Sequence, residues 1–198
     1  SLFVFMSTDV LLFYLFFEAT LIPMYFLIGG FGGPRRAYAA VKFLLFSLAG
    51  GLVMLASVIG LYVWSVRLTG TPTYLLSELG KLDLGTNLGR WLMVGFLIAF
   101  IVKAPMVPLH TWLPTATEES TPGTSVLLVG ILDKIGTFGM IRFCLGLFPE
   151  ASQWVAPVMI VLALISIIYG AVAAIGSSNL LRLVAYTSIS HFGFMVLG

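Results

Sequence analysis

Ionisable side chains inside apolar segments are the residues of this sequence best suited to chemistry. Glu18 stands in DVLLFYLFFEATLIPMYFLI, Lys103 closes WLMVGFLIAFIVK, and Lys134 lies within LLVGILDKIGTFGMI. A charged side chain costs about 2.5–3.5 kcal/mol at the centre of a membrane helix, so such residues face the bundle interior, pair with one another or contact water. Loss of water disfavours the charged forms of lysine and glutamate, whereas a nearby opposite charge favours them. A buried set of lysines and a glutamate is therefore suited to taking up and releasing protons.

Two interpretations fit these charged residues. They could form structural ion pairs that hold helices together, or they could line an ion pathway. Glu18, Lys103 and Lys134 fall on three separate apolar segments, with His191 on a fourth, and this distribution favours the pathway. Asp133 points about 100° away from its neighbour Lys134 on a helix, and we expect it to neutralise a cation on another helix.

The two histidines can each titrate near neutral pH. For His110, a structural hydrogen bond and a proton relay are equally open. His191 lies in TSISHFGFM with hydroxyl groups close by in sequence. Small polar residues of this type often join membrane helices, so a relay at His191 competes with a packing role.

A helix break is expected in IVKAPMVPLHTWLP, directly behind an apolar run. Pro105 and Pro108 have no N–H group, so carbonyl groups before them lose their helical partners. Free carbonyl groups at membrane depth persist only where protein or water satisfies them. Discontinuous helices of this type line ion sites in transporters. A proline kink without function is the alternative, but Lys103 beside the break favours a site.

Composition indicates what must position these residues. The chain has 198 residues, 60% of them hydrophobic and 9% charged, with a mean hydropathy of +1.09. Soluble domains carry about 25% charged residues, so we expect an all-α polytopic membrane protein, folded as a single membrane domain over residues 1–198. Segments of about 20 apolar residues predict about six transmembrane helices. We place them at 6–28, 38–66, from 91, 124–147, 153–174 and from 181, with a polar loop over 67–90.

Other features exclude several classes of function. The net charge of +2 gives no reason to expect nucleic acid as a partner. Neither a metal-ligand cluster nor a glycine-rich phosphate loop is visible in the sequence, and Cys144 is expected to be a buried thiol. The glycines of SLAGG and KIGTFG are expected to allow close helix packing. The sequence stops within the apolar stretch HFGFMVLG, from which we expect a fragment of a longer chain.

Several of these motifs resemble one known family. The stretch VKAPMVPLHTWLP…STPGTSVLLVGILDKIGTFGMIR is similar to the antiporter-like subunits of respiratory complex I, the NADH-quinone oxidoreductase, and most closely to their M type. The segments FFEATLIPMYFLIGGFGG, KFLLFSLAGGLVML and RLVAYTSISHFGFMVLG agree, so the resemblance spans nearly the whole chain. The L and N types and the Mrp-type cation/proton antiporters share the KxPxxPxHxWLP pattern.

The resemblance implies a fold, an activity and roles for residues. The family is built from two inverted repeats of helices, and this chain would cover most of the first and the start of the second. It implies a proton half-channel in which Glu18 and Lys103 form a modulating pair, Lys134 passes protons toward the centre, and His191 lies on the central axis. His110 matches the histidine of the PLHxWLP motif. The chain departs from the family at Thr115, where an aspartate is usual, and at Asn179 and Leu181, where charged residues are usual.

The resemblance also implies partners. The chain would be a translocase subunit without a redox site, while NADH, FMN, iron–sulfur clusters and quinone bind to other subunits of the complex. Its partners would be neighbouring membrane subunits, the lipid bilayer and protons, in a bacterial plasma membrane or a mitochondrial inner membrane. The alternatives are a subunit of an Mrp-type sodium/proton antiporter or membrane hydrogenase, and a structural membrane subunit that transports nothing.

Overall fold

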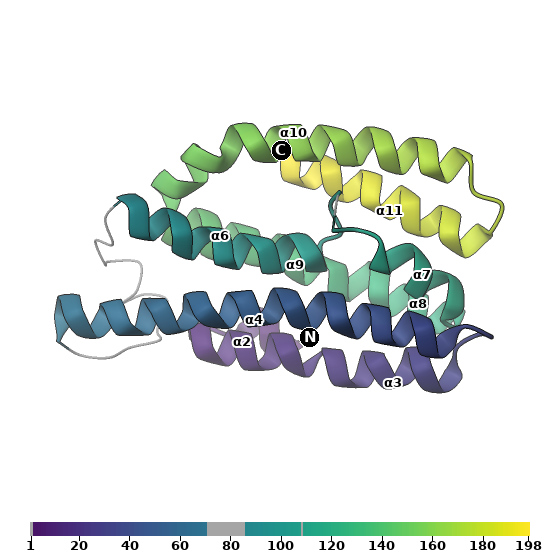
Figure 1. The fold of residues 1–198 in the computed structure, drawn as a ribbon, viewed down its shortest axis with the longest axis horizontal. Helices are drawn as coiled ribbons and strands as arrows, with labels where there is room; N and C mark the ends of the chain where they lie inside the picture. Colours follow the sequence, from purple (N-terminus) through teal and green to yellow (C-terminus); the bar gives the residue numbers. More distant parts are fainter. Residues whose placement is uncertain (1, 71–85, 108) are drawn as a thin grey trace.

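The chain folds into a bundle of helices that lie roughly parallel or antiparallel to one another (Figure 1). The structure is a computed structural model, and it describes residues 2–70, 86–107 and 109–198. The elements in chain order are α1 (Leu2–Met6), α2 (Val10–Ala19), α3 (Leu21–Phe31), α4 (Arg36–Thr69), α6 (Thr86–Lys103), α7 (Trp112–Glu119), α8 (Pro122–Leu127), η1 (Leu128–Leu132), α9 (Asp133–Gly139), η2 (Met140–Leu145), α10 (Pro149–Ile175) and α11 (Leu180–Leu197). The all-α fold predicted from composition is confirmed for these residues.

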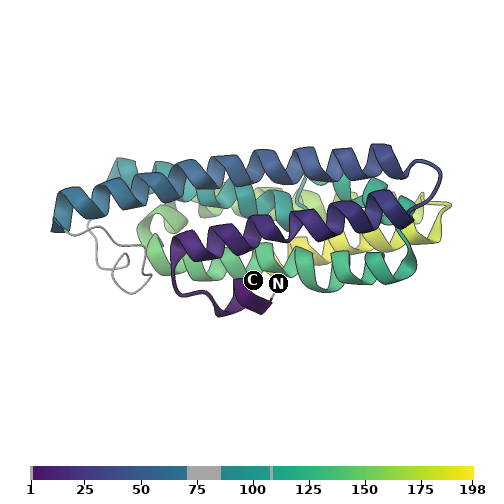
Figure 2. The same ribbon diagram turned by 90° about the horizontal axis from the view of Figure 1, so that it is seen from below.

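Among the residues that the structure describes, five helical segments are long and apolar enough to cross a membrane. They are Val10–Phe31, Arg36–Arg67, Pro122–Leu145, Pro149–Ile175 and Leu180–Leu197. These segments correspond to five of the six predicted spans, and the remaining one, expected from residue 91, corresponds to α6 in the same bundle (Figure 2). Most of the predicted loop over 67–90 lies outside the described residues. The chain is therefore a multi-pass integral membrane protein.

The first span begins later than the sequence suggested. We expected it to start at residue 6, but Met6 ends the separate short helix α1. Asp9 is the reason, because its Oδ1 accepts a hydrogen bond from the Leu12 backbone N–H at 3.0 Å and so caps α2. An aspartate in this position satisfies one of the open N–H groups at a helix start. The span accordingly runs from Val10, in α2, to Phe31, in α3.

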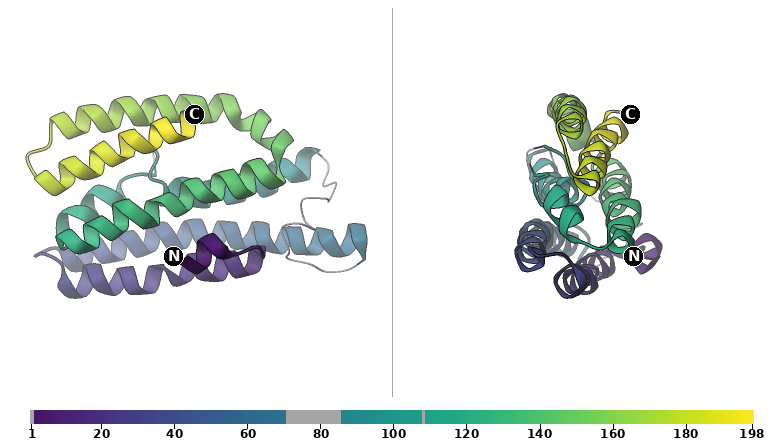
Figure 3. Two further views of the ribbon diagram at one scale, coloured as in Figure 1. Left: turned by 180° about the vertical axis from the view of Figure 1, so that it is seen from behind. Right: turned by 90° about the vertical axis from the view of Figure 1, so that its right-hand side faces the viewer.

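The bundle has three layers. The α10–α11 hairpin forms one side, α2, α3 and α4 form the other, and the segment from α6 to η2 lies between them (Figures 1 and 3). Glycines bring the layers close together, as the sequence predicted for SLAGG and KIGTFG. A Cβ atom added at Gly50 would lie 3.3 Å from Val102, and one added at Gly136 would lie 2.6 Å from the Ala104 backbone nitrogen.

Aromatic side chains fill the centre between α2, α6 and η2. The largest buried rings there are Phe13 and Phe17 of α2, Phe96 and Phe100 of α6, and Phe143 of η2. The Phe13 and Phe143 ring centroids are 4.4 Å apart, and those of Phe96 and Phe143 are 5.5 Å apart. Such ring pairs contribute about 0.5–1.5 kcal/mol each beyond their buried area. This cluster fixes α2, which carries Glu18, against α6, which ends at Lys103.

Candidate functional site at the broken helix

The third predicted span is interrupted, as the two prolines indicated. Helix α6 ends at Lys103 and α7 begins at Trp112, with turns between them. The last regular bond runs from the Ala104 N–H to the Phe100 carbonyl at 2.7 Å. Pro105 has no N–H to continue the series, and Met106 instead donates to the Ile101 carbonyl at 3.4 Å. The break at Pro105 is confirmed, whereas Pro108 lies outside the described residues.

The carbonyl group freed by the break is satisfied by protein. The Trp112 indole Nε1–H donates to the Val102 carbonyl at 2.8 Å, and Trp112 is 1% exposed. On the other side, the Val107 N–H donates to the Ser166 hydroxyl of α10 at 3.0 Å. Neither partner was identified from the sequence. A signal for Trp112 was present, because a buried indole N–H usually finds an acceptor.

Lys103 lies at the end of α6 with its side chain buried. It is 2% exposed, and its Nζ lies 5.0 Å from the Phe17 ring centroid and 5.8 Å from that of Phe43. Both rings are close enough to attract the ammonium group through their π faces. The ammonium group therefore points into the space between α2 and α4.

Glu18 approaches the same space from α2. It follows Phe17 directly, and its charge interacts with that of Lys103. Its carboxylate lies against Gly51 of α4, at a position that a Cβ atom on residue 51 would occupy. Glu18 Oε1 is buried and has no hydrogen-bond partner among the residues that the structure describes. The glycine thus gives the carboxylate its place beside α4.

His110 is buried within the break. It is 6% exposed, and its ring meets that of Tyr169 in α10 edge to face, with centroids 4.8 Å apart. The break is thus enclosed by α10 on the side that faces away from α4.

Lys134 and His191 are placed differently from Lys103. Lys134 is on α9 and His191 is on α11, and both side chains are exposed on the bundle. The backbone of α9 nevertheless packs on α6 beside Lys103, because Gly136 lies against Phe100 and Ala104. Near His191, the Ser190 hydroxyl donates to the Ile167 carbonyl of α10 at 2.9 Å, which is the helix-joining role considered for these hydroxyl groups. The structure therefore brings Glu18 and Lys103 together in the interior and leaves Lys134 and His191 on the surface of the described bundle.

The helix that carries Lys134 is irregular. Two π-helical stretches, η1 and η2, flank α9. Such stretches are uncommon and occur frequently at functional sites, because they shift the register of the side chains that follow. The side chain of Asp133, beside Lys134, lies outside what the structure describes.

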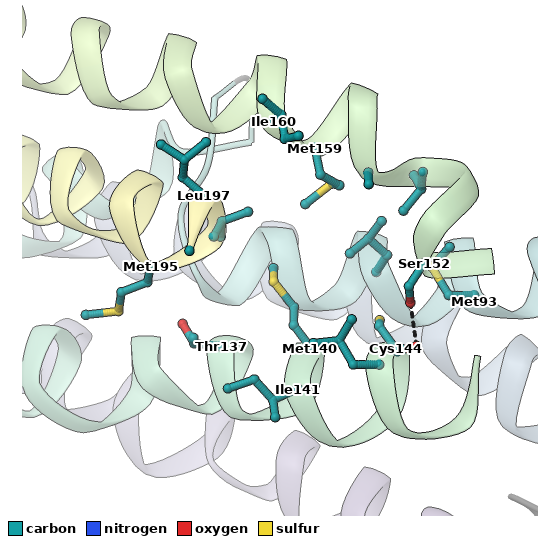
Figure 4. A pocket seen from close by; sticks show the side chains of 16 residues that line it. Met93, Thr137, Met140, Ile141, Cys144, Ser152, Met159, Ile160, Met195 and Leu197 are labelled. Atoms are coloured by element: carbon teal, nitrogen blue, oxygen red, sulfur yellow. Dashed lines mark hydrogen bonds between the residues drawn. The ribbon is translucent and has the colours of Figure 1, made fainter. Parts of the chain in front are cut away.

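A cavity of about 510 Å³ lies between α6, η2, α10 and α11 (Figure 4). Its lining is mainly apolar and includes Met140, Met159 and Met195, together with Cys144. Cys144 is buried, as expected from its apolar surroundings. None of the described residues that line the cavity is charged, and neither Glu18 nor Lys103 is among them.

The residues that depart from the family pattern lie at the polar end of the bundle. Thr115 of α7 accepts a hydrogen bond from Lys42 Nζ of α4 at 3.3 Å. Asn179 caps α11 by accepting from the Leu181 N–H at 3.0 Å, and its Nδ2 donates to Glu118 at 3.5 Å.

Within the described part of the chain, no group of three or more His, Cys, Asp or Glu side chains is placed to hold a metal ion.

Comparison with known proteins gives consistent similarities. The family model described as "NADH:quinone oxidoreductase/Mrp antiporter, TM" matches residues 7–198. NADH-quinone oxidoreductase subunit M of Mycobacterium tuberculosis (strain H37Rv) is 53% identical over 203 residues, which cover 97% of this chain and 36% of that protein. The subunit of the same name from Escherichia coli (strain K12) is 43% identical over 199 residues, covering 98% of this chain and 39% of that protein. The chain thus spans well under half the length of these curated relatives.

Solved structures show a similar fold. A chain of the respiratory complex I from Thermus thermophilus with bound NADH matches with a TM-score of 0.85 and 39% identity, over 94% of this chain and 39% of that chain. A chain of the Mrp complex from Dietzia sp. DQ12-45-1b matches with a TM-score of 0.80 and 29% identity, over 96% of this chain and 20% of that chain.

Proposed function

Because the chain belongs to the NADH:quinone oxidoreductase/Mrp antiporter transmembrane family, we propose that it forms part of a membrane subunit of a proton-pumping NADH:quinone oxidoreductase. In this proposal the chain carries one half of a proton path. The relatives named subunit M, which match almost the entire chain, support this assignment over other members of the family.

The observation that carries the proposal is the buried Lys103 at a broken helix. A lysine with 2% exposure cannot exchange protons with bulk water directly, and the nearby Glu18 charge controls how strongly its ammonium form is favoured. When Glu18 approaches Lys103, the ammonium form is favoured, and when it withdraws, the lysine releases its proton. We propose that the proton then moves through water to Lys134 and along the axis to His191, with His110 beside the break as a further carrier.

The exposed positions of Lys134 and His191 are compatible with this path. A charged side chain facing lipid at mid-membrane is costly, so we propose that protein or water covers these residues in the complete assembly. Neighbouring membrane subunits of the complex would be the partners. NADH, FMN, iron–sulfur clusters and quinone would bind elsewhere in the complex and not to this chain. The membrane would be a bacterial plasma membrane or a mitochondrial inner membrane.

A second candidate is a subunit of an Mrp-type sodium/proton antiporter. The structural similarity to the Dietzia Mrp complex favours it, since that match covers 96% of this chain with a TM-score of 0.80. The two functions differ in their dependence on sodium. Proton transport by the full-length subunit in its membrane should be independent of sodium if it belongs to an NADH:quinone oxidoreductase, and should require sodium if it belongs to an antiporter.

A double replacement distinguishes a proton-pumping subunit from one whose charges only hold helices together. Glu18→Gln and Lys103→Met together remove both charges while keeping similar side-chain volumes, so helix packing should survive. We expect the full-length subunit with both replacements to assemble and to pump fewer protons. Full pumping by this variant would contradict the proposal and would favour ion pairs that only hold helices together.

A further inference from the structure

Helix α7, the second half of the broken helix, is held between two hairpins (Figure 1). On the side of α3 and α4, the backbone takes part in the contacts. The Glu119 carbonyl accepts from the Gly33 N–H, and the Glu119 carboxylate accepts from the Arg35 N–H at 3.0 Å. These bonds tie α7 to the turn between α3 and α4 itself.

On the side of α11, two side chains hold α7. Arg182 Nη1 lies 2.9 Å from Glu118 Oε2, and both side chains are part-exposed at the polar end of the bundle. Asn179 adds a longer bond to the other oxygen of Glu118. Arg182 also donates to the Tyr186 hydroxyl at 3.3 Å. The attachment of α7 to α11 therefore depends on a charge pair, which can form and separate without unfolding either helix.

The same hairpin also contacts the end of the segment that precedes α7. Tyr186 meets Tyr169 edge to face with centroids 6.3 Å apart, and Tyr169 meets His110 at 4.8 Å. Contacts thus run from Arg182 in two directions, directly to Glu118 at the end of α7 and through two tyrosines to His110 before its beginning. Trp112 at the start of α7 donates a hydrogen bond to the Val102 carbonyl, next to Lys103. A shift of α7 would therefore displace the backbone beside the lysine.

We propose that the Arg182–Glu118 pair positions α7 and the break, so that movement of the α10–α11 hairpin changes the surroundings of Lys103 and His110. This proposal rests on the proposed proton translocation. Arg182 and Glu118 carry no proton in it, and they act through the place of α7. Because the hairpin also bears His191, the pair would link the buried lysine to the helix on which the proton path continues.

The experiment compares single and exchanged charges in the full-length subunit within its native membrane complex. The variants are Glu118→Gln, Arg182→Gln and the exchanged double variant Glu118→Arg with Arg182→Glu. We expect each single variant to lower the protons pumped per electron by about two- to fivefold, the fold-change that corresponds to the coupling of a part-exposed charge pair. The exchanged variant should recover at least half of the lost ratio, because it restores an attractive pair. Glu150→Gln, at an exposed carboxylate in the first turn of α10, is the matched control and should leave the ratio unchanged.

The outcomes separate this proposal from the proposed function. Single variants that keep the full ratio would overturn the positioning role, and so would a loss explained entirely by a smaller amount of assembled complex. Failure of the exchanged variant to recover would overturn the pairing. Lys103→Ala is measured alongside: if it lowers pumping while the Arg182 and Glu118 variants do not, the proposed function stands and only the positioning role fails. If Lys103→Ala has no effect, the proposed function itself fails.

Discussion

Gly136 is the contact point at which the helix bearing Lys134 meets the end of α6. Its α-carbon faces backbone atoms of Phe100 and Ala104, and a Cβ there would lie 2.6 Å from the Ala104 nitrogen and 2.7 Å from the Phe100 oxygen. Non-bonded heavy atoms prefer separations of about 3.5–4.0 Å, so Gly136→Ala forces α9 away from α6 by roughly 1 Å. Backbone atoms cannot move aside as the tip of a flexible side chain can.

The energetic cost follows from two opposing effects. Overpacking costs about 1–3 kcal/mol. Replacing glycine by alanine within a helix contributes about 0.5–1 kcal/mol of stabilisation. We therefore expect Gly136→Ala to lower the free energy of unfolding by up to about 2.5 kcal/mol, a cost that the bundle can absorb. The larger effect should fall on proton transfer, where a misplacement of about 1 Å can reduce a rate by up to about 100-fold.

Gly130→Ala is the matched control in the same span, because a Cβ at residue 130 meets no atom within 4 Å. Both variants would be made in the full-length subunit, and proton pumping into sealed membrane vesicles and thermal unfolding of the purified complex would be measured. Gly136→Ala should pump more slowly than Gly130→Ala, which should match the unmodified protein or be slightly more stable. Equal behaviour of the two variants would refute the close approach of α9 and α6 as the reason for glycine at residue 136.

Three further changes probe the break and the site. Trp112→Phe keeps a ring but leaves the Val102 carbonyl unsatisfied, and should lower stability by about 1–3 kcal/mol; an unchanged unfolding temperature would contradict it. Ser166→Ala removes the acceptor of the Val107 N–H and should cost a similar amount, about 1–3 kcal/mol, by the same assay; retention of full stability would show that this bond is dispensable. Gly51→Ala places a methyl group where the Glu18 carboxylate lies, so pumping should fall while assembly is kept. Gly30→Ala is the control, because a Cβ atom at residue 30 meets no atom within 4 Å. Equal pumping by the two variants would argue against this placement of the carboxylate.

The break itself could be predicted from the sequence because its cause is local. Pro105 cannot donate a backbone hydrogen bond, and α6 ends two residues before it, at Lys103. The partner of the Val102 carbonyl could not be predicted in the same way. It is Trp112, ten residues later, and it reaches that carbonyl only because of the path that the intervening turns take.

The pairing of Glu18 with Lys103 was likewise only partly predictable from the sequence. Sequence position indicated that both residues need an interior place, and the resemblance indicated that they act together. Their approach depends on the aromatic cluster between α2 and α6 and on the missing side chain of Gly51, which are long-range properties of packing. The exposure of Lys134 could not be judged from the sequence either, since the burial of one helix face depends on which helices pack against it.

The predicted start of the first span was wrong, although the sequence contains the residue that sets the actual start. Asp9 lies directly before the apolar run and is a favoured helix-capping residue, so a start at Val10 could have been inferred. Hydropathy alone extended the span backward to the apolar residue Met6, across the polar residues Ser7 and Thr8.

In the proposed path, Lys103 carries protons. The number of protons pumped per electron transferred from NADH to quinone tests this role, measured in sealed vesicles that contain the complex with Lys103→Ala. The amount of assembled complex is measured in the same vesicles, so that a loss of assembly is not mistaken for a loss of pumping. We expect a lower proton-to-electron ratio than that of the unmodified complex, together with slower quinone reduction. An unchanged ratio in the fully assembled variant would show that Lys103 is not part of the proton path.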